Sequence, residues 1–148
     1  MMTWRRIFAA LSLLGAAGSA LAIDYRSVDV PAAVLYDSPS QKGKKLYLIK
    51  AQTPVEVVVR LDAWSKVRDA EGTLAWIESR SLSERRMLIV TAASAEIRQA
   101  DKPDAAVVSE LDKAVAVEFI EAASPGWAKV RHRDGATGYI RSTQVWGL

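Results

Sequence analysis

The second half of the sequence repeats the first, and this repeat limits the possible folds more than any other feature. The segment Trp64–Arg68 (WSKVR) recurs as Trp127–Arg131 (WAKVR), 63 residues further along the chain. Upstream of the tryptophans the offset is 62 residues. One extra residue in the loop before the second tryptophan explains the change, because loops tolerate insertions and strands do not. The chain is therefore predicted to contain two copies of one unit, over residues 26–86 and 87–148.

Each unit is predicted to form β-strands. Segments 55–59 and 87–91 are rich in β-branched residues, which favour the pleated, half-buried surface of a sheet. In both copies the strand after the tryptophan leads into a charged turn that ends in a glycine, Gly72 or Gly135. This is a hairpin signal, because glycine adopts the positive φ of a tight turn. Units of this size bury only about 60% of their unfolded surface, so the two copies are expected to pack against each other.

Two short motifs identify the unit. The second copy contains the segment 126–130 (GWAKV) and, after the hairpin turn, 138–140 (GYI). These motifs, on strands in a unit of this length, resemble bacterial SH3 domains, which are small barrels of five to six strands. The first copy departs from the pattern at Ala63 and Ala75, which replace the two glycines. The resemblance implies an all-β fold of two tandem SH3-like small β-barrels packed against each other.

The resemblance extends at a distance to eukaryotic SH3 domains, where the corresponding tryptophan helps to form a groove for polyproline peptides. Those domains carry the segment Gly-Tyr-Ile-Pro-Ser-Asn-Tyr. The second copy has Arg141 at the proline and Gln144 at the second tyrosine, and the first copy has Glu78 and Ser81. Because stacking of proline rings needs a row of aromatic faces, polyproline binding is not expected.

The N-terminus predicts export. Arg5 and Arg6 precede an uncharged run, residues 7–22, that ends in Ala-Leu-Ala. Residues 1–22 are therefore assigned as a cleavable secretory signal peptide. An uncleaved membrane anchor is the alternative, but the run is shorter than the roughly 20 residues that span a bilayer. The mature protein is predicted to be periplasmic, with no membrane span after cleavage.

Charge and residue content exclude several classes of function. Cleavage would remove two of the positive charges behind the net charge of +3, so the mature chain would lack the basic surplus that nucleic-acid binding uses. The chain has no cysteine and one histidine, His132, in a predicted hairpin turn. A nucleophile with a positioned base, or a zinc ligand set, is therefore missing. The protein is predicted to be non-catalytic, with no metal and no cofactor.

Aromatic and basic residues on the two hairpins form the predicted binding site. Period-two alternation places the lysine and arginine on the face opposite the inward valine, beside an aromatic ring. Flat rings next to cations suit a ligand that has apolar faces and carboxylates, such as the glycan and peptide of a bacterial wall. The predicted residues are Trp64, Lys66, Arg68 and Trp76 in the first copy and Trp127, Lys129, Arg131 and Tyr139 in the second.

A structural role is the alternative for these aromatics, since large rings often close the core of a small barrel. The second copy is favoured as the binding copy, because Gly126 and Gly138 would permit close approach of another chain. Tyr36, Tyr47 and Trp146 are predicted to contact the other barrel. The lysine-rich run at 42–45 is interpreted as a solvated loop, with contact to an anionic ligand as the alternative.

The predicted function follows from export and from the lack of catalytic groups. We expect a non-catalytic periplasmic binding module for a cell-wall component, most simply peptidoglycan. The alternative is a protein–protein interaction module, or adaptor, of the cell envelope that does not bind glycan.

Overall fold

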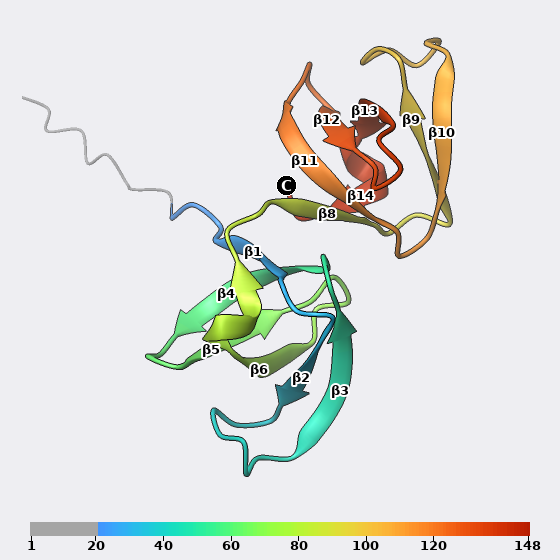
Figure 1. Ribbon diagram of the computed structural model, residues 1–148. Coiled ribbons are helices and arrows are strands. Elements are labelled where there is room, and N and C mark those ends of the chain that lie inside the picture. Colours follow the sequence, from blue (N-terminus) through green and yellow to red (C-terminus); the bar gives the residue numbers. More distant parts are fainter. Residues whose placement is uncertain (1–20) are drawn as a thin grey trace, which may run out of the picture.

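The chain folds into two small β-barrels that lie one above the other (Figure 1). The computed structural model describes residues 21–148, so nearly all of the predicted signal peptide lies outside the described residues. All strand pairs are antiparallel, and each barrel is one seven-stranded sheet. No helix in the described range is long and apolar enough to cross a membrane. The predicted all-β fold of two tandem barrels is confirmed.

The first barrel contains the strands β1 (Tyr25–Val28), β2 (Ala32–Tyr36), β3 (Lys45–Lys50), β4 (Pro54–Arg60), β5 (Trp64–Arg68), β6 (Leu74–Glu78) and β7 (Leu82–Ser83). Their order in the sheet is β3-β2-β6-β5-β4-β1-β7. A single turn of 3-10 helix, Ser79–Ser81, lies between β6 and β7.

The second barrel contains β8 (Met87–Val90), β9 (Ser94–Arg98), β10 (Val107–Asp112), β11 (Ala116–Ala122), β12 (Trp127–Arg131), β13 (Thr137–Arg141) and β14 (Val145–Trp146). The strand order, β10-β9-β13-β12-β11-β8-β14, matches that of the first barrel, and a second 3-10 turn, Ser142–Gln144, precedes β14. The repeat in the sequence is therefore a repeat of topology.

The change of offset between the copies is confirmed in the loop before each tryptophan. In the first barrel the N–H of Leu61 donates to the carbonyl of Trp64 at 2.8 Å, which leaves two residues in the loop. In the second barrel the N–H of Ala123 donates to the carbonyl of Trp127 at 3.1 Å, around a three-residue loop. Gly126 adopts the φ of 86° that this longer turn needs.

The predicted hairpins are also confirmed. β5 pairs with β6 and β12 with β13 over their whole lengths. Gly72 and Gly135 close the two turns at φ values of 87° and 93°. A side chain at either position would be strained in this left-handed backbone.

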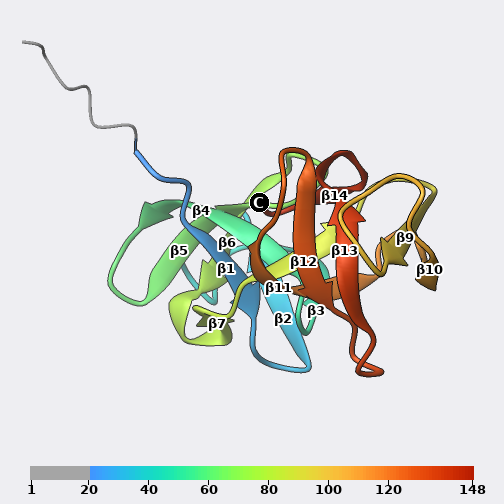
Figure 2. The ribbon, with the colours of Figure 1, turned by 90° about the horizontal axis from the view of Figure 1, so that it is seen from above.

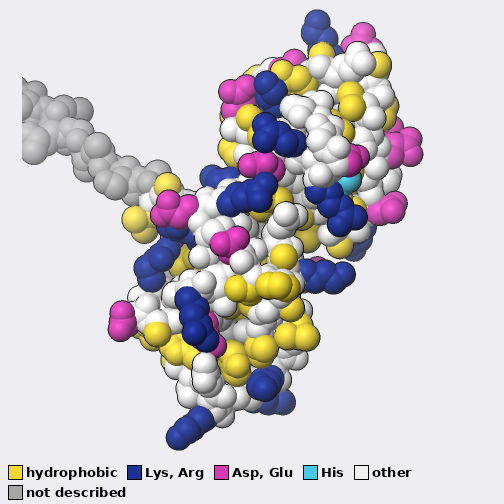
Figure 3. Space-filling model, in the orientation of Figure 1, with side chains coloured by type: hydrophobic (Ala, Val, Ile, Leu, Met, Phe, Trp, Pro, Cys, Tyr) yellow, Lys and Arg dark blue, Asp and Glu magenta, His cyan; other side chains and the backbone are white. Residues whose placement is uncertain are grey.

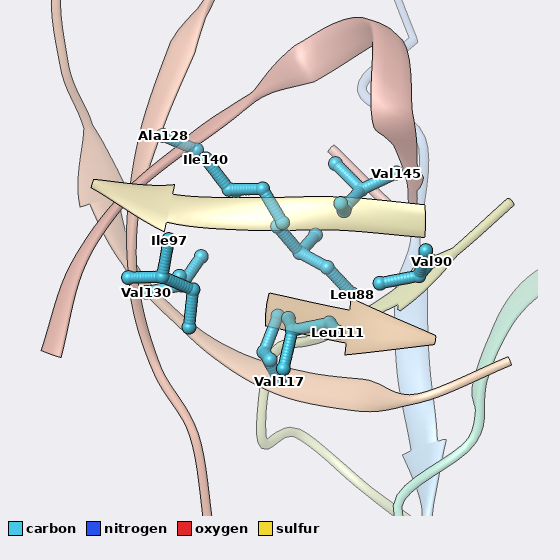
Figure 4. Packing of buried hydrophobic residues seen from close by; sticks show 10 residues of the cluster. Leu88, Val90, Ile97, Leu111, Val117, Ala128, Val130, Ile140 and Val145 are labelled. Atoms are coloured by element: carbon cyan, nitrogen blue, oxygen red, sulfur yellow. The ribbon is translucent and has the colours of Figure 1, made fainter. Parts of the chain in front are cut away.

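Each barrel has its own apolar core. The second core contains Leu88, Val90, Ala95, Ile97, Leu111, Val117, Ala128, Val130, Ile140 and Val145, whose larger side chains converge in Figure 4. The first core contains Val28, Ala33, Leu35, Ile49, Val55, Val67, Ala75 and Ile77. Because Val67 and Val130 point inward, their neighbours on β5 and β12 point outward, as the alternation predicts.

The barrels meet at the linker and the C-terminus. The guanidinium of Arg86 lies 5.4 Å from the ring centroid of Tyr25 in the first barrel and 5.2 Å from that of Phe119 in the second. Arg86 also donates to the carbonyl of Gly147 at 2.7 Å. Trp146 meets Tyr25 edge to face, with the centroids 5.1 Å apart. The predicted inter-barrel contact of Trp146 is confirmed.

The same prediction for Tyr36 and Tyr47 is wrong. Tyr36 packs edge to face against Trp64 of its own barrel, with the centroids 5.4 Å apart. The hydroxyl of Tyr47 donates to Asp69 of its own barrel at 2.7 Å. Both tyrosines therefore contact residues at β5, across their own barrel, rather than the second barrel.

Candidate functional site

The predicted cations lie on the outer faces but already have partners. The recorded contacts are Arg68 with Glu56 at 2.8 Å, Arg131 with Glu118 at 3.6 Å, Lys129 with Glu121 at 3.7 Å, and Lys66 over the ring of Trp76 at 5.9 Å. A carboxylate on a ligand would have to compete with three protein carboxylates. The arrangement therefore does not favour an anionic ligand at these positions.

The tryptophan of the second barrel is covered. Trp127 is 9% exposed, and the guanidinium of Arg141 lies over its ring, 4.9 Å from the centroid. This corrects the expectation that Trp127 presents an open ring to a ligand. The physical reason is a cation–π contact from the residue that follows Ile140 on β13, which sequence spacing does not reveal.

The glycines of the second barrel serve the fold. A Cβ at Gly138 would clash with the carbonyl oxygen of Arg98 and lie 2.7 Å from Cγ2 of Ile97. The close approach is thus that of the neighbouring strand β9 rather than of a ligand. Tyr139 is half-buried beside Lys129, its partner across β12 and β13.

The first barrel leaves Trp64 more open than Trp127, although Tyr36 beside it is buried, at 7% exposed. Trp64 is half-buried and touches Tyr36, which in turn pairs with Trp76 across β2 and β6. Glu78 is the partner of Trp64 across β5 and β6. In the second barrel the position of Glu78 is held by Arg141, which covers the tryptophan.

A hollow of about 350 Å³ opens beside these residues, over β2 and the end of β6. We call it the β2 groove. Its walls include Val30, Ala33, Val34, Tyr36, Glu78 and Arg80.

The β2 groove combines apolar walls with one pair of opposite charges. The carboxylate of Glu78 accepts a hydrogen bond from the Gln41 side chain at 3.1 Å and pairs with Nε of Arg80 at 2.7 Å. The Glu78 side chain is 23% exposed, whereas that of Arg80 is 79% exposed. A half-buried carboxylate and a guanidinium in solvent can each bind a group of opposite charge.

The sequence pattern missed the groove residues on β2, among them Tyr36. A signal was present, because Tyr36 corresponds to Arg98 in the second copy, and Glu78 corresponds to Arg141. Differences between equivalent positions, rather than shared residues, mark the open groove.

The single histidine of the chain lies in the hairpin turn between β12 and β13. The imidazole of His132 lies in a turn with Nδ1 3.1 Å from Asp134. The backbone N–H of Ala136, and then His132, lower the pKa of the Asp134 carboxyl. Residues 21–148 contain no group of three or more histidine and acidic side chains placed to hold a metal ion.

Solved structures similar to this chain include two proteins from Trichomonas vaginalis and one from Bacillus cereus. They are NlpC2 (15% identity, TM-score 0.41), NlpC1 (18%, 0.40) and an NlpC/P60 family protein (15%, 0.38). The matches cover 86%, 91% and 82% of this chain but 49%, 50% and 55% of those chains, so this chain spans about half their length. Likeness at this level carries no argument about function.

No curated protein matches the sequence. The family described as "Bacterial SH3 domain" matches it twice, over residues 29–84 and 91–147. Each match covers one barrel and most of its strands. The chain therefore belongs to the bacterial SH3 domain family, of which it contains two copies in tandem.

Proposed function

We propose that this protein is a non-catalytic binding module of the cell envelope, and that its β2 groove binds the peptide part of peptidoglycan. The observation that carries the proposal is the groove itself, in which apolar walls lie beside Tyr36 and the Glu78–Arg80 pair. Membership of the bacterial SH3 family supports a binding role. The periplasmic location rests on the signal peptide expected at residues 1–22.

The chemistry of the wall peptide matches the groove. Such peptides carry alanine methyl groups, free carboxylates and a diamino acid with an ammonium group. Val30 and Val34 offer a surface for small methyl groups beside Tyr36, whose side chain is largely buried in the wall of the groove, with 7% of the residue exposed. Glu78 can bind the ammonium and Arg80 a carboxylate, because a ligand with both charges replaces the existing ion pair without leaving either group unpaired.

A co-sedimentation assay with purified peptidoglycan tests the proposal. The wild-type chain should sediment with the sacculi. Glu78→Arg copies the residue of the second barrel, removes the carboxylate from the groove and puts a positive charge beside Arg80 in its place. We expect at least a tenfold loss of affinity, since a charge-assisted hydrogen bond is worth about 1.5–3 kcal/mol.

The matched control is Arg141→Glu, the reverse exchange at the equivalent position of the second barrel. This variant should bind as the wild type does, because Arg98 still holds the place of Tyr36. Wild-type protein that stays in the supernatant at every salt concentration contradicts the proposal. Equal loss in both variants contradicts the assignment to the first barrel.

An envelope protein is the rival ligand, since the groove would also accept a peptide segment of a protein. Crosslinking in periplasmic extract separates the two. A stoichiometric protein partner that depends on Glu78, together with no sedimentation, would favour the adaptor role.

A further inference from the structure

The two barrels expose equivalent edge strands. β3 and β10 are the outermost strands at one end of their sheets, so each has one backbone edge without a partner in its own sheet. Both lie on the same side of the molecule, at the right in Figure 1. Their C-terminal ends meet at the junction, where Lys50, Glu110 and Asp112 line one hollow of about 410 Å³. The two edges therefore approach each other at the junction between the barrels.

The two edges carry opposite charge. Residues 37–50 contain one acid, Asp37, and the lysines Lys42, Lys44, Lys45 and Lys50. The equivalent residues 99–112 contain one lysine, Lys102, and the acids Asp101, Asp104, Glu110 and Asp112. The first segment therefore has a net charge of +3 and the second of −3. Within residues 21–148 none of these side chains takes part in an ion pair, so the charges are available to another molecule.

Both edges also expose aliphatic side chains. On β3, Leu46 and Leu48 are 40% and 68% exposed. On β10, Val107 and Val108 are 43% and 40% exposed. An unpaired edge with exposed aliphatic residues is a surface on which another strand can add.

We propose that these edges join two copies of the protein in a two-fold dimer, with β3 of each copy against β10 of its partner. The basic edge and the acidic edge lie end to end. A two-fold axis through the junction therefore places the basic edge of each copy against the acidic edge of the other. Such a self-complementary interface closes at two copies and covers the β3 and β10 edges of both. The proposal does not depend on the proposed function, since none of the side chains named on β3 or β10 belongs to the β2 groove.

Charge-reversal variants with a rescue test this dimer by sedimentation velocity on the chain without the expected signal peptide. The wild type should dimerise, and the dimer should weaken as salt rises from about 0.05 M to about 0.5 M, because salt screens exposed charges. Lys45→Glu with Lys50→Glu should raise the dissociation constant at least tenfold. Glu110→Lys with Asp112→Lys should do the same. All four residues are exposed, so their replacement should leave the barrels folded.

An equimolar mixture of the two double variants should regain the dimer, because every contact then again joins opposite charges. The control Asp62→Lys with Glu121→Lys makes the same change of charge as the double variant of Glu110 and Asp112, but away from β3 and β10. It should dimerise like the wild type. Wild-type protein that remains a monomer at low salt would overturn the proposal, and so would a mixture that fails to regain the dimer. Assemblies larger than a dimer would overturn the closed two-fold arrangement.

Discussion

The two barrels have the same strand order and similar apolar cores, yet their outer faces differ at equivalent positions. Where the first barrel has Val34, Tyr36, Leu48 and Glu78, the second has Glu96, Arg98, Glu110 and Arg141. On the visible face in Figure 3, hydrophobic side chains spread over the first barrel, and charged groups cover much of the second. The core positions have thus stayed mainly apolar in both copies, while the outer positions have changed in charge and size.

The difference has a direct effect on the tryptophans. In the second barrel Arg141 covers Trp127, and Arg98 is held by the carbonyl of Ala105 at 2.7 Å. In the first barrel Glu78 pairs with Arg80 and lines the β2 groove, and Trp64 stays half-buried. This difference is the reason for assigning the proposed ligand to the first barrel.

The largest effect is expected from exchanging a core position that differs between the barrels. Gly138 of the second barrel corresponds to Ala75 of the first, which is 2% exposed. Gly138→Ala would bring a methyl group against the backbone carbonyl of Arg98. We expect a loss of about 3 kcal/mol in the free energy of unfolding, as for an overpacked core, measured by urea denaturation.

The reverse change, Ala75→Gly, should cost only about 1 kcal/mol, because it removes one methyl group and loosens the backbone. Hydrogen exchange should show the loss of stability in the second barrel for Gly138→Ala and in the first barrel for Ala75→Gly. If Gly138→Ala leaves the free energy of unfolding unchanged, β13 does not pack against the carbonyl of Arg98 as closely as described.

An intermediate effect is expected from a polar contact found in the first barrel alone. Tyr47 donates to Asp69, which is 9% exposed and also accepts the N–H groups of Glu71 and Thr73. The second barrel has Ser109 and His132 at the positions of Tyr47 and Asp69. Tyr47→Phe should lower the free energy of unfolding by about 2 kcal/mol, the usual range for a hydrogen bond to a charged group. Ser109→Ala is the matched control and should have little effect.

The same tyrosine should make the free energy of unfolding fall as the pH becomes alkaline. Burial, and then the hydrogen bond to Asp69, raise the pKa of Tyr47 well above its usual value. A raised pKa in the folded state means that the stabilisation is complete below about pH 10, the unfolded value, and is lost as the pH rises further. Tyr47→Phe should flatten this decline. Part of it should remain, because burial, and then Glu56, raise the pKa of Tyr25 as well.

Much of the fold could be predicted from the sequence because it depends on local rules. The repeat, the hairpin glycines and the alternation around Val67 and Val130 gave the strands, the turns and the direction of the outer side chains. These features act over a few residues or between neighbouring strands. The outward position of Lys66 and Lys129 followed for the same reason.

The site could not be predicted as well, because it depends on which side chain covers which ring. The glycines at 126 and 138 suggested an open second barrel, but they serve a turn and a tight strand pair. The exposure of Trp127 depends on Arg141, fourteen residues later in the chain. The alternation of residues along a strand does not predict the side-chain rotamer of that arginine. Tyr36 was likewise assigned to the wrong contact.

The smallest effect is expected from removing the Arg141 side chain, which covers the ring of Trp127. Arg141→Ala should expose the ring of Trp127 and increase quenching of tryptophan fluorescence by acrylamide, at a cost of about 0.5–1 kcal/mol in the free energy of unfolding for the lost cation–π contact. Residues 21–148 contain three other tryptophans, which also fluoresce. The same measurement on Trp127→Phe combined with Arg141→Ala therefore shows how much of the change in quenching comes from Trp127. Glu78→Ala is the matched change in the first barrel.

Glu78→Ala should leave quenching almost unchanged, because within residues 21–148 no guanidinium lies over the ring of Trp64. Equal quenching in the wild type and Arg141→Ala would mean that Arg141 does not shield the ring, and the contrast between a covered and an open tryptophan would disappear. If quenching rises but wall binding does not, an exposed ring is insufficient for a site. The groove then requires Tyr36 and its apolar neighbours, which the second barrel replaces with Arg98 and Glu96.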